Sequence, residues 1–261
     1  MENVKQILAV ILIITFFSAC EKSEEDPMDN LKTSINAKWN VDNSGKYISF
    51  EFNESGNYII VKNVTKTYEN KQVVLFGSYQ MMENNNILLP GFGTLNIIDI
   101  EKSGISFSIQ LIDNTINEIF INASKENEIA SSTKTDLLCK TWEMLSVNGE
   151  LAGGTDMEIT SLFSKSGTYF VSYATPEDEN AGGLAQWRWK DETETHLLYS
   201  WAEVPAWEKA DSVHISELTS TKLKIIDGDD TYILQPQSTI NSIMDISSVP
   251  SDILRSDFLH E

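Results

Sequence analysis

The stretch YISFEFNESGNYIIV, residues 47–61, contains two apolar alternating segments with a polar turn between them. Apolar side chains recur with a period of two, which is typical of strands that place one face on a core. The alternating residues are Ile48, Phe50, Phe52, Tyr58 and Ile60. Residues 54–57 supply the turn, where Gly56 is able to adopt a positive φ. The stretch therefore predicts an antiparallel β-hairpin.

A second copy of this pattern lies in LFSKSGTYFVSY, residues 162–173. Four residues of the first hairpin recur 111 positions later, as Phe163, Ser166, Gly167 and Tyr169. A tryptophan precedes each hairpin, Trp39 in the first copy and Trp142 in the second, with an aliphatic residue four positions before it, Ile35 or Leu138. Self-similarity at this spacing indicates two similar structural units.

The sequence pattern of both copies indicates β-structure. Neither contains an apolar pattern of period 3.6 that persists through three turns, whereas short alternating segments recur between turn signals. The expected fold is all-β, with two tandem small antiparallel β-barrel or sandwich domains. The predicted divisions are a signal peptide at 1–19, a lipidated cysteine and acidic tether at 20–33, a first domain at 34–125, a linker at 126–136, a second domain at 137–236 and a C-terminal tail at 237–261.

The motifs INAKW, FNESGNY and FGSYQ in the first copy, and LCKTW, FSKSGTY and AQWRW in the second, resemble the small lipocalin-like domains of bacterial lipoproteins. The resemblance covers about 200 residues of short motifs. It departs from true lipocalins because Ala37 and Lys140 stand where the early G-x-W motif has glycine. Each copy is also shorter than a complete eight-stranded lipocalin. The resemblance implies barrel domains but does not by itself imply a ligand-holding calyx.

The amino terminus has the order of an export signal. A short polar segment with Lys5 is followed by an apolar run of eleven residues, 7–17, which is too short to span a bilayer. Ser18, Ala19 and Cys20 then resemble a bacterial lipobox, with Phe17 where an aliphatic residue is usual. We expect acylation of Cys20 and a lipid-anchored protein of the bacterial envelope, at the outer membrane, on its periplasmic face or at the cell surface. The alternative is an ordinary secretory signal that contains a cysteine.

Charge and composition exclude several functions. The net charge of −20, from 39 acidic and 19 basic residues, repels phosphate backbones, so we expect no nucleic-acid partner. Cys139 fits a small buried residue. His196 and His214 could meet across neighbouring strands, but the chain has no histidine or cysteine spacing typical of a metal site. We therefore expect no metal, no cofactor and no enzymatic activity.

Aromatic residues concentrate in the second copy, which holds five of the six tryptophans. Trp142 and Trp187 match Trp39 and Tyr79 of the first copy, which favours a core position for both. The candidate ligand-binding residues of the second domain are Trp187, Trp189, Trp201 and Trp207. Indole rings line lipophilic pockets and stack on sugars. We expect a binding protein for a small apolar or amphipathic ligand. The alternatives are a structural or protein-interaction lipoprotein with filled barrels, and a cell-surface glycan-binding module.

Overall fold

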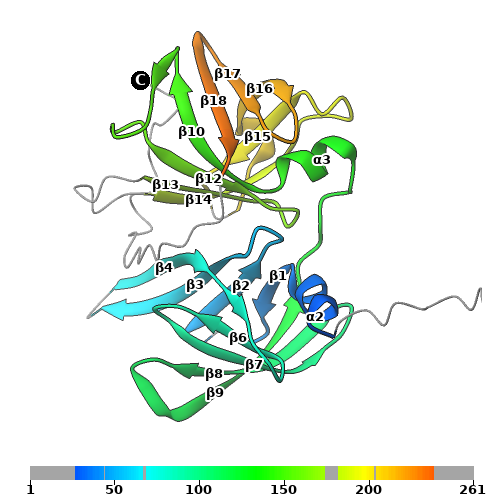
Figure 1. The fold of residues 1–261 in the computed structure, drawn as a ribbon, viewed down its shortest axis with the longest axis vertical. Helices are drawn as coiled ribbons and strands as arrows, with labels where there is room; N and C mark the ends of the chain where they lie inside the picture. Colours follow the sequence, from blue (N-terminus) through cyan, green and yellow to red (C-terminus); the bar gives the residue numbers. More distant parts are fainter. Residues whose placement is uncertain (1–26, 44, 67–68, 174–181, 203, 238–261) are drawn as a thin grey trace, which may run out of the picture.

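The computed structural model describes residues 27–43, 45–66, 69–173, 182–202 and 204–237. These residues form two antiparallel β-barrels, one above the other in Figure 1, each built from a nine-stranded sheet. The structure confirms the expected all-β fold and its tandem barrels. The predicted signal peptide, Cys20 and nearly all of the C-terminal tail lie outside the described residues. No helix within the described ranges is long and apolar enough to cross a membrane.

The first barrel is an up-and-down meander whose sheet curls almost into a closed barrel. Its elements are α2 (Pro27–Ile35), β1 (Lys38–Val41), β2 (Tyr47–Phe52), β3 (Asn57–Lys66), β4 (Glu69–Ser78), β5 (Gln80–Met81), β6 (Asn86–Leu89), β7 (Gly93–Ile100), β8 (Gly104–Leu111) and β9 (Asn114–Lys125). Strand β1 pairs with both β2 and β9. The two ends of the sheet, β4 and β5, are joined in the chain by Tyr79, so the barrel is nearly closed.

The second barrel repeats this order and closes fully. Its elements are α3 (Thr133–Leu138), β10 (Thr141–Val147), β11 (Glu150–Leu151), β12 (Ile159–Phe163), β13 (Thr168–Tyr173), β14 (Gly182–Trp189), β15 (His196–Ser200), the 3-10 helix η2 (Trp207–Lys209), β16 (Asp211–Leu218), β17 (Leu223–Asp227) and β18 (Asp230–Pro236). Pairing of β10 with β18 completes the barrel. Each copy thus supplies a barrel sheet of nine strands, although the copy is shorter than a complete lipocalin.

A short helix precedes the first strand of each barrel, and it explains the aliphatic residue four positions before each tryptophan. The indole Nε1 of Trp39 donates to the carbonyl of Ile35, and that of Trp142 donates to the carbonyl of Leu138, both at 2.9 Å. The bond satisfies a carbonyl in the last turn of the helix, where no intrahelical donor is available. Helix α2 covers residues 27–33 of the expected tether, and α3 begins within the expected linker.

The two predicted hairpins are β2–β3 and β12–β13. Gly56 has φ 80° and Gly167 has φ 79°, which confirms that each turn uses the left-handed region that favours glycine. The predicted alternation of β2 is wrong at Ile48, because a β-bulge between Tyr47 and Ser49 shifts the register. Tyr47 therefore joins the barrel core, and Ile48 packs on the outside.

The outer faces of β2–β4 and β12–β14 pack against each other and join the barrels (Figure 1). The buried apolar residues of this interface are Ile59, Val61, Val74, Phe76, Leu162 and Phe170. The rings of Phe76 and Phe170 lie 4.7 Å apart between centroids. Buried hydrogen bonds also cross the interface, including one of 2.9 Å from Thr141 to Asn57. The described residues of the two barrels therefore pack directly against each other, and the linker is not their sole connection.

Candidate binding sites

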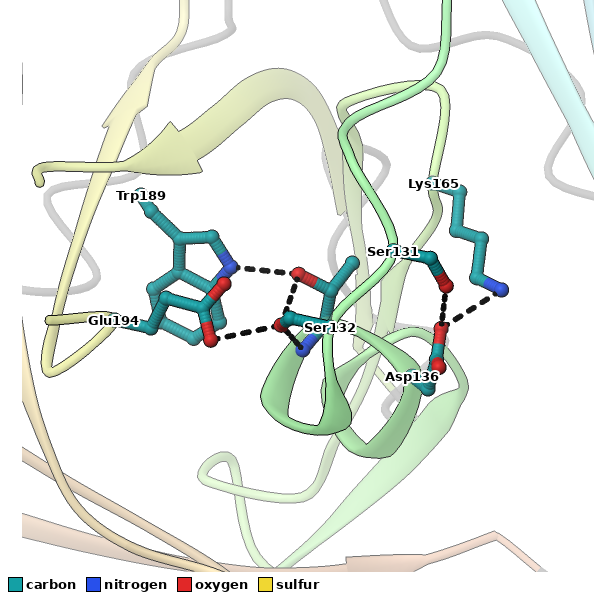
Figure 2. A network of polar contacts seen from close by, with 7 residues as sticks. Ser131, Ser132, Asp136, Lys165, Trp189 and Glu194 are labelled. Carbon is teal, nitrogen blue, oxygen red and sulfur yellow. Dashed lines mark hydrogen bonds and ion pairs between the residues drawn. The ribbon is translucent and has the colours of Figure 1, made fainter. Parts of the chain in front are cut away.

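Two of the four candidate tryptophans serve the packing of the second barrel. Trp187 is 1% exposed, and its Nε1 donates to the carbonyl of Ser164 at 2.9 Å, which confirms the predicted core position. Trp189 lies on the same face, with its ring 5.6 Å from that of Trp187. Its Nε1 donates to Oγ1 of Thr135 on α3 at 2.9 Å (Figure 2). The polar edges of both indoles are therefore bonded within the protein.

Helix α3 is held by polar side chains at its amino-terminal end (Figure 2). The Ser132 hydroxyl accepts a bond from the Thr135 amide at 3.0 Å, a typical N-cap, and donates to Glu194 at 2.7 Å. Ser131 donates to Asp136 at 2.6 Å, and this bond is the main cause that lowers the pKa of the Asp136 carboxyl. The network fixes α3 against β14 and closes this end of the barrel.

Trp201 closes the opposite end of the second barrel. Strand β14 runs from Gly182 to Trp189, and Trp189 marks the end that α3 covers. At the other end, the Trp201 ring lies so close to Gly183 that a Cβ there would stand 2.5 Å from it. Its ring centroid is 5.8 Å from that of Tyr169 and 6.1 Å from that of Tyr199. The ring therefore fills the mouth of the barrel.

Trp207 lies apart from the other three, in η2 outside the barrel. The Arg188 guanidinium carbon is 4.5 Å from the centroid of its ring, a cation–π contact. The structure thus brings Trp187 and Trp189 together at one end of the barrel and places Trp201 and Trp207 elsewhere.

The described residues of the second barrel leave little space inside it. The cavity that they line measures about 20 Å³, room for a single water molecule, whereas small-molecule pockets usually occupy roughly 300–1,000 Å³. Three tyrosines line it, and burial raises the pKa of each of them: Tyr169, Tyr199 and Tyr232, the last to about 12. Their hydroxyls therefore stay protonated and neutral, as suits a core.

The first barrel has a pocket of about 250 Å³ at the end away from α2. Strand β1 starts near α2 with Trp39 and ends at Val41, which lines the pocket. Its wall is largely apolar and comes from β1, β2, β9 and the connection between β1 and β2. The main lining residues are Val41, Lys46, Tyr47, Ile119, Phe120 and Ile121. An open apolar mouth is thus present in the barrel that contains fewer tryptophans.

Tyr47 is the distinctive residue of this pocket. It is 2% exposed, and its buried hydroxyl has no hydrogen-bond partner among the described residues. Its ring packs against Phe50 and Phe92 at centroid distances of 5.3 and 6.0 Å, and the Lys46 ammonium lies 5.6 Å from its centroid. Burial raises the pKa of Tyr47, so the hydroxyl keeps its proton and is a donor without an acceptor. The sequence did not indicate this residue, because the β-bulge that turns it inward leaves no pattern.

The two strand histidines meet across neighbouring strands, an arrangement that the sequence allowed but did not favour. His196 and His214 are directly opposite each other on β15 and β16, with ring centroids 4.9 Å apart. Within the described ranges, no three side chains of His, Cys, Asp or Glu cluster as metal ligands would. The described part of the chain thus places no third potential ligand beside the histidine pair.

A scan of known protein families and a search of curated proteins found no match to this chain. The tandem barrel architecture therefore rests on the structure itself. The likeness to lipocalin-like lipoproteins stays a prediction from the motifs.

Proposed function

We propose that this protein is a lipid-anchored, non-enzymatic binding protein of the bacterial envelope, and that it takes a small amphipathic ligand into the mouth of the first barrel. The observation that carries the proposal is the unpartnered hydroxyl of Tyr47 at an apolar pocket. Leaving a buried polar group unpaired costs free energy, which a ligand acceptor would recover.

The volume and the lining residues of the pocket limit the size and chemistry of the ligand. Its 250 Å³ has room for roughly eight groups of the size of a water molecule. Apolar walls from Val41, Ile119 and Ile121 suit a short aliphatic chain, and the Tyr47 hydroxyl suits an acceptor at its end. Lys46 lines the same pocket, which favours a carboxylate as that acceptor. A medium-chain fatty acid has this chemistry.

The filled interior of the second barrel favours a different role for that domain. The cavity of about 20 Å³ between its described residues fits the alternative of a structural or protein-interaction module. Its contribution to the protein would then be the surface that packs against the first barrel.

Replacing Tyr47 with phenylalanine should weaken binding of octanoate by roughly 10- to 150-fold, the range expected for one hydrogen bond to a charged carboxylate. The melting temperature should not fall, because the hydroxyl has no partner to lose. Isothermal titration calorimetry and thermal unfolding measure the two quantities.

Tyr79→Phe is the matched control, because the Tyr79 hydroxyl donates within the protein, at 3.0 Å to Asn36 and at 3.1 Å to the carbonyl of Asn53. This variant should lose stability and bind octanoate as the wild type does. Undetectable octanoate binding by the wild type, or equal affinity in Tyr47→Phe, would contradict the proposal.

Lipid attachment is tested by metabolic labelling with a fatty acid. The wild type and Cys139→Ser should carry the label and sediment with membranes, whereas Cys20→Ser should do neither. Several acyl chains on one residue hold a protein on a bilayer durably, so losing that residue should release it. Equal label in all three proteins would refute acylation at Cys20.

A further inference from the structure

A cleft of about 480 Å³ lies between the two barrels, within the usual size range of small-molecule sites. The first barrel contributes the end of α2 and the start of the β2–β3 turn, and the second contributes the β12–β13 turn. Pockets are common where two domains meet. This cleft borders α2, so it is distinct from the pocket at the far end of the first barrel.

Glu51 gives the cleft an unused hydrogen-bond acceptor. It lies on β2 between Phe50 and Phe52, which point into the barrel, so its own side chain points toward the second barrel. It is 4% exposed, and its Oε2 accepts a bond of 2.7 Å from the Thr168 hydroxyl across the interface. Its Oε1 is buried and has no partner among the described residues. A buried carboxyl oxygen of this kind is satisfied when a ligand brings a donor.

Two of the lysines that line the cleft are already neutralised. Lys125 pairs with Glu128 at 2.6 Å. Lys165 pairs with Asp136 at 2.9 Å, at the edge of the network in Figure 2. Neither lysine is therefore free to satisfy Glu51.

Charged side chains of both signs line the cleft without forming an ion pair to another described residue. Among the described residues, Lys32 on α2 and Glu54 in the β2–β3 turn form no ion pair. Together with Glu51 they give the cleft one free ammonium and two carboxyl groups. A ligand with an ammonium group and an anionic group matches this set better than a simple cation or anion does.

The remaining wall is not reactive. Cys139 lines the cleft beside Phe52 and Phe163, and burial raises the pKa of its thiol to about 12. The thiol is therefore neutral at physiological pH and is a poor nucleophile. Recognition in the cleft must then come from hydrogen bonds and charge.

We propose that the cleft between the barrels binds a small zwitterion, whose ammonium group donates to Oε1 of Glu51 and whose anionic group pairs with Lys32. This site takes a different ligand from the fatty-acid pocket and does not depend on it. The net charge of −20 adds a general attraction for the cationic end.

The test is calorimetric titration of the protein with glycine, 4-aminobutyrate and 6-aminohexanoate, three zwitterions of increasing length. Butyrate and butylamine each keep only one of the two charges. At least one zwitterion should bind, and each single-charge analogue should bind at least ten-fold more weakly. Binding of none of the three zwitterions would overturn the proposal, and equal affinity for butylamine would overturn the role of Lys32.

Glu51→Gln and Lys32→Gln should each weaken zwitterion binding at least ten-fold. Glutamine at position 51 keeps an acceptor for Thr168 but replaces the free oxygen with a donor, and Lys32 is exposed, so its replacement does not disturb folding. Glu217→Gln, which removes an exposed partner of Lys222, should bind as the wild type does. Unchanged affinity in Glu51→Gln would overturn the site. Octanoate binding should be unaffected by Glu51→Gln, and zwitterion binding by Tyr47→Phe, so the two proposals fail separately.

Discussion

Replacing Trp142 with alanine is expected to lower the free energy of unfolding by about 3–5 kcal/mol. The side chain is fully buried, and its Nε1 bonds the carbonyl of Leu138 at the end of α3. The substitution therefore leaves a large cavity and an unpaired carbonyl. Domains are stable by only about 5–15 kcal/mol, so the second barrel should lose much of its stability. Denaturant unfolding followed by tryptophan fluorescence and circular dichroism measures the change.

Trp207→Ala is the matched control, because Trp207 lies outside the barrel and its ring contacts the Arg188 guanidinium. The same change there should cost about 1 kcal/mol or less. Trp39→Ala should reproduce the Trp142 effect in the first barrel, because Trp39 makes the equivalent bond to Ile35. A loss below 1 kcal/mol in Trp142→Ala would show that the tryptophan does not hold the helix to its barrel.

The barrels were predictable because their pattern is local and occurs twice. The hairpin turns at Gly56 and Gly167 and the strands beside them follow from residues close together in the chain. The helices were missed because α2 has nine residues and α3 six, too short for an apolar period to show through three turns. The tryptophan bond ties the end of each helix to the first strand of its barrel, and the sequence shows only the spacing of the two residues that make it.

The candidate sites were less predictable from the sequence. Each depends on a neighbouring side chain or a hydrogen-bond partner that is absent in the folded structure. Trp201 looked available for a ligand, but Gly183 lacks a side chain and lets the indole fill the mouth of the second barrel. Conversely, Tyr47 and Glu51 sit in ordinary alternating strand sequence. Their unpartnered atoms result from a β-bulge and from the meeting of two barrels, which are contacts between distant parts of the chain.

The contact between the barrels connects stability to the cleft. Its apolar residues lie on the outer faces of strands, where a barrel that stands alone would place polar side chains. Glu51 and Thr168 meet at the same interface, so the cleft exists only while the barrels stay together. The pocket at Tyr47 is built from β1, β2, β9 and the β1–β2 connection, all in the first barrel, and does not need the second barrel.

Phe170→Asp is expected to separate the barrels. Phe170 is 1% exposed and packs on Phe76 and Leu162, so the substitution removes apolar contact and places a carboxylate where no water reaches it. Burying an unpaired charge costs several kcal/mol, and the carboxylate regains hydration only if the interface opens. The radius of gyration from small-angle X-ray scattering should increase, and calorimetry should show two unfolding transitions. Zwitterion binding should be lost, while octanoate binding is retained.

Phe120→Asp provides the control, because Phe120 is 69% exposed on the first barrel and the same change buries no charge there. It should keep the wild-type radius of gyration, unfolding profile and affinity for the zwitterion. Limited proteolysis adds an independent measurement, since the connection at 126–132 loses the fixed positions of its two ends when the barrels separate and should be cut faster in Phe170→Asp. A Phe170→Asp protein that stays compact and unfolds as the wild type does would show that the interface tolerates the charge and does not hold the barrels together.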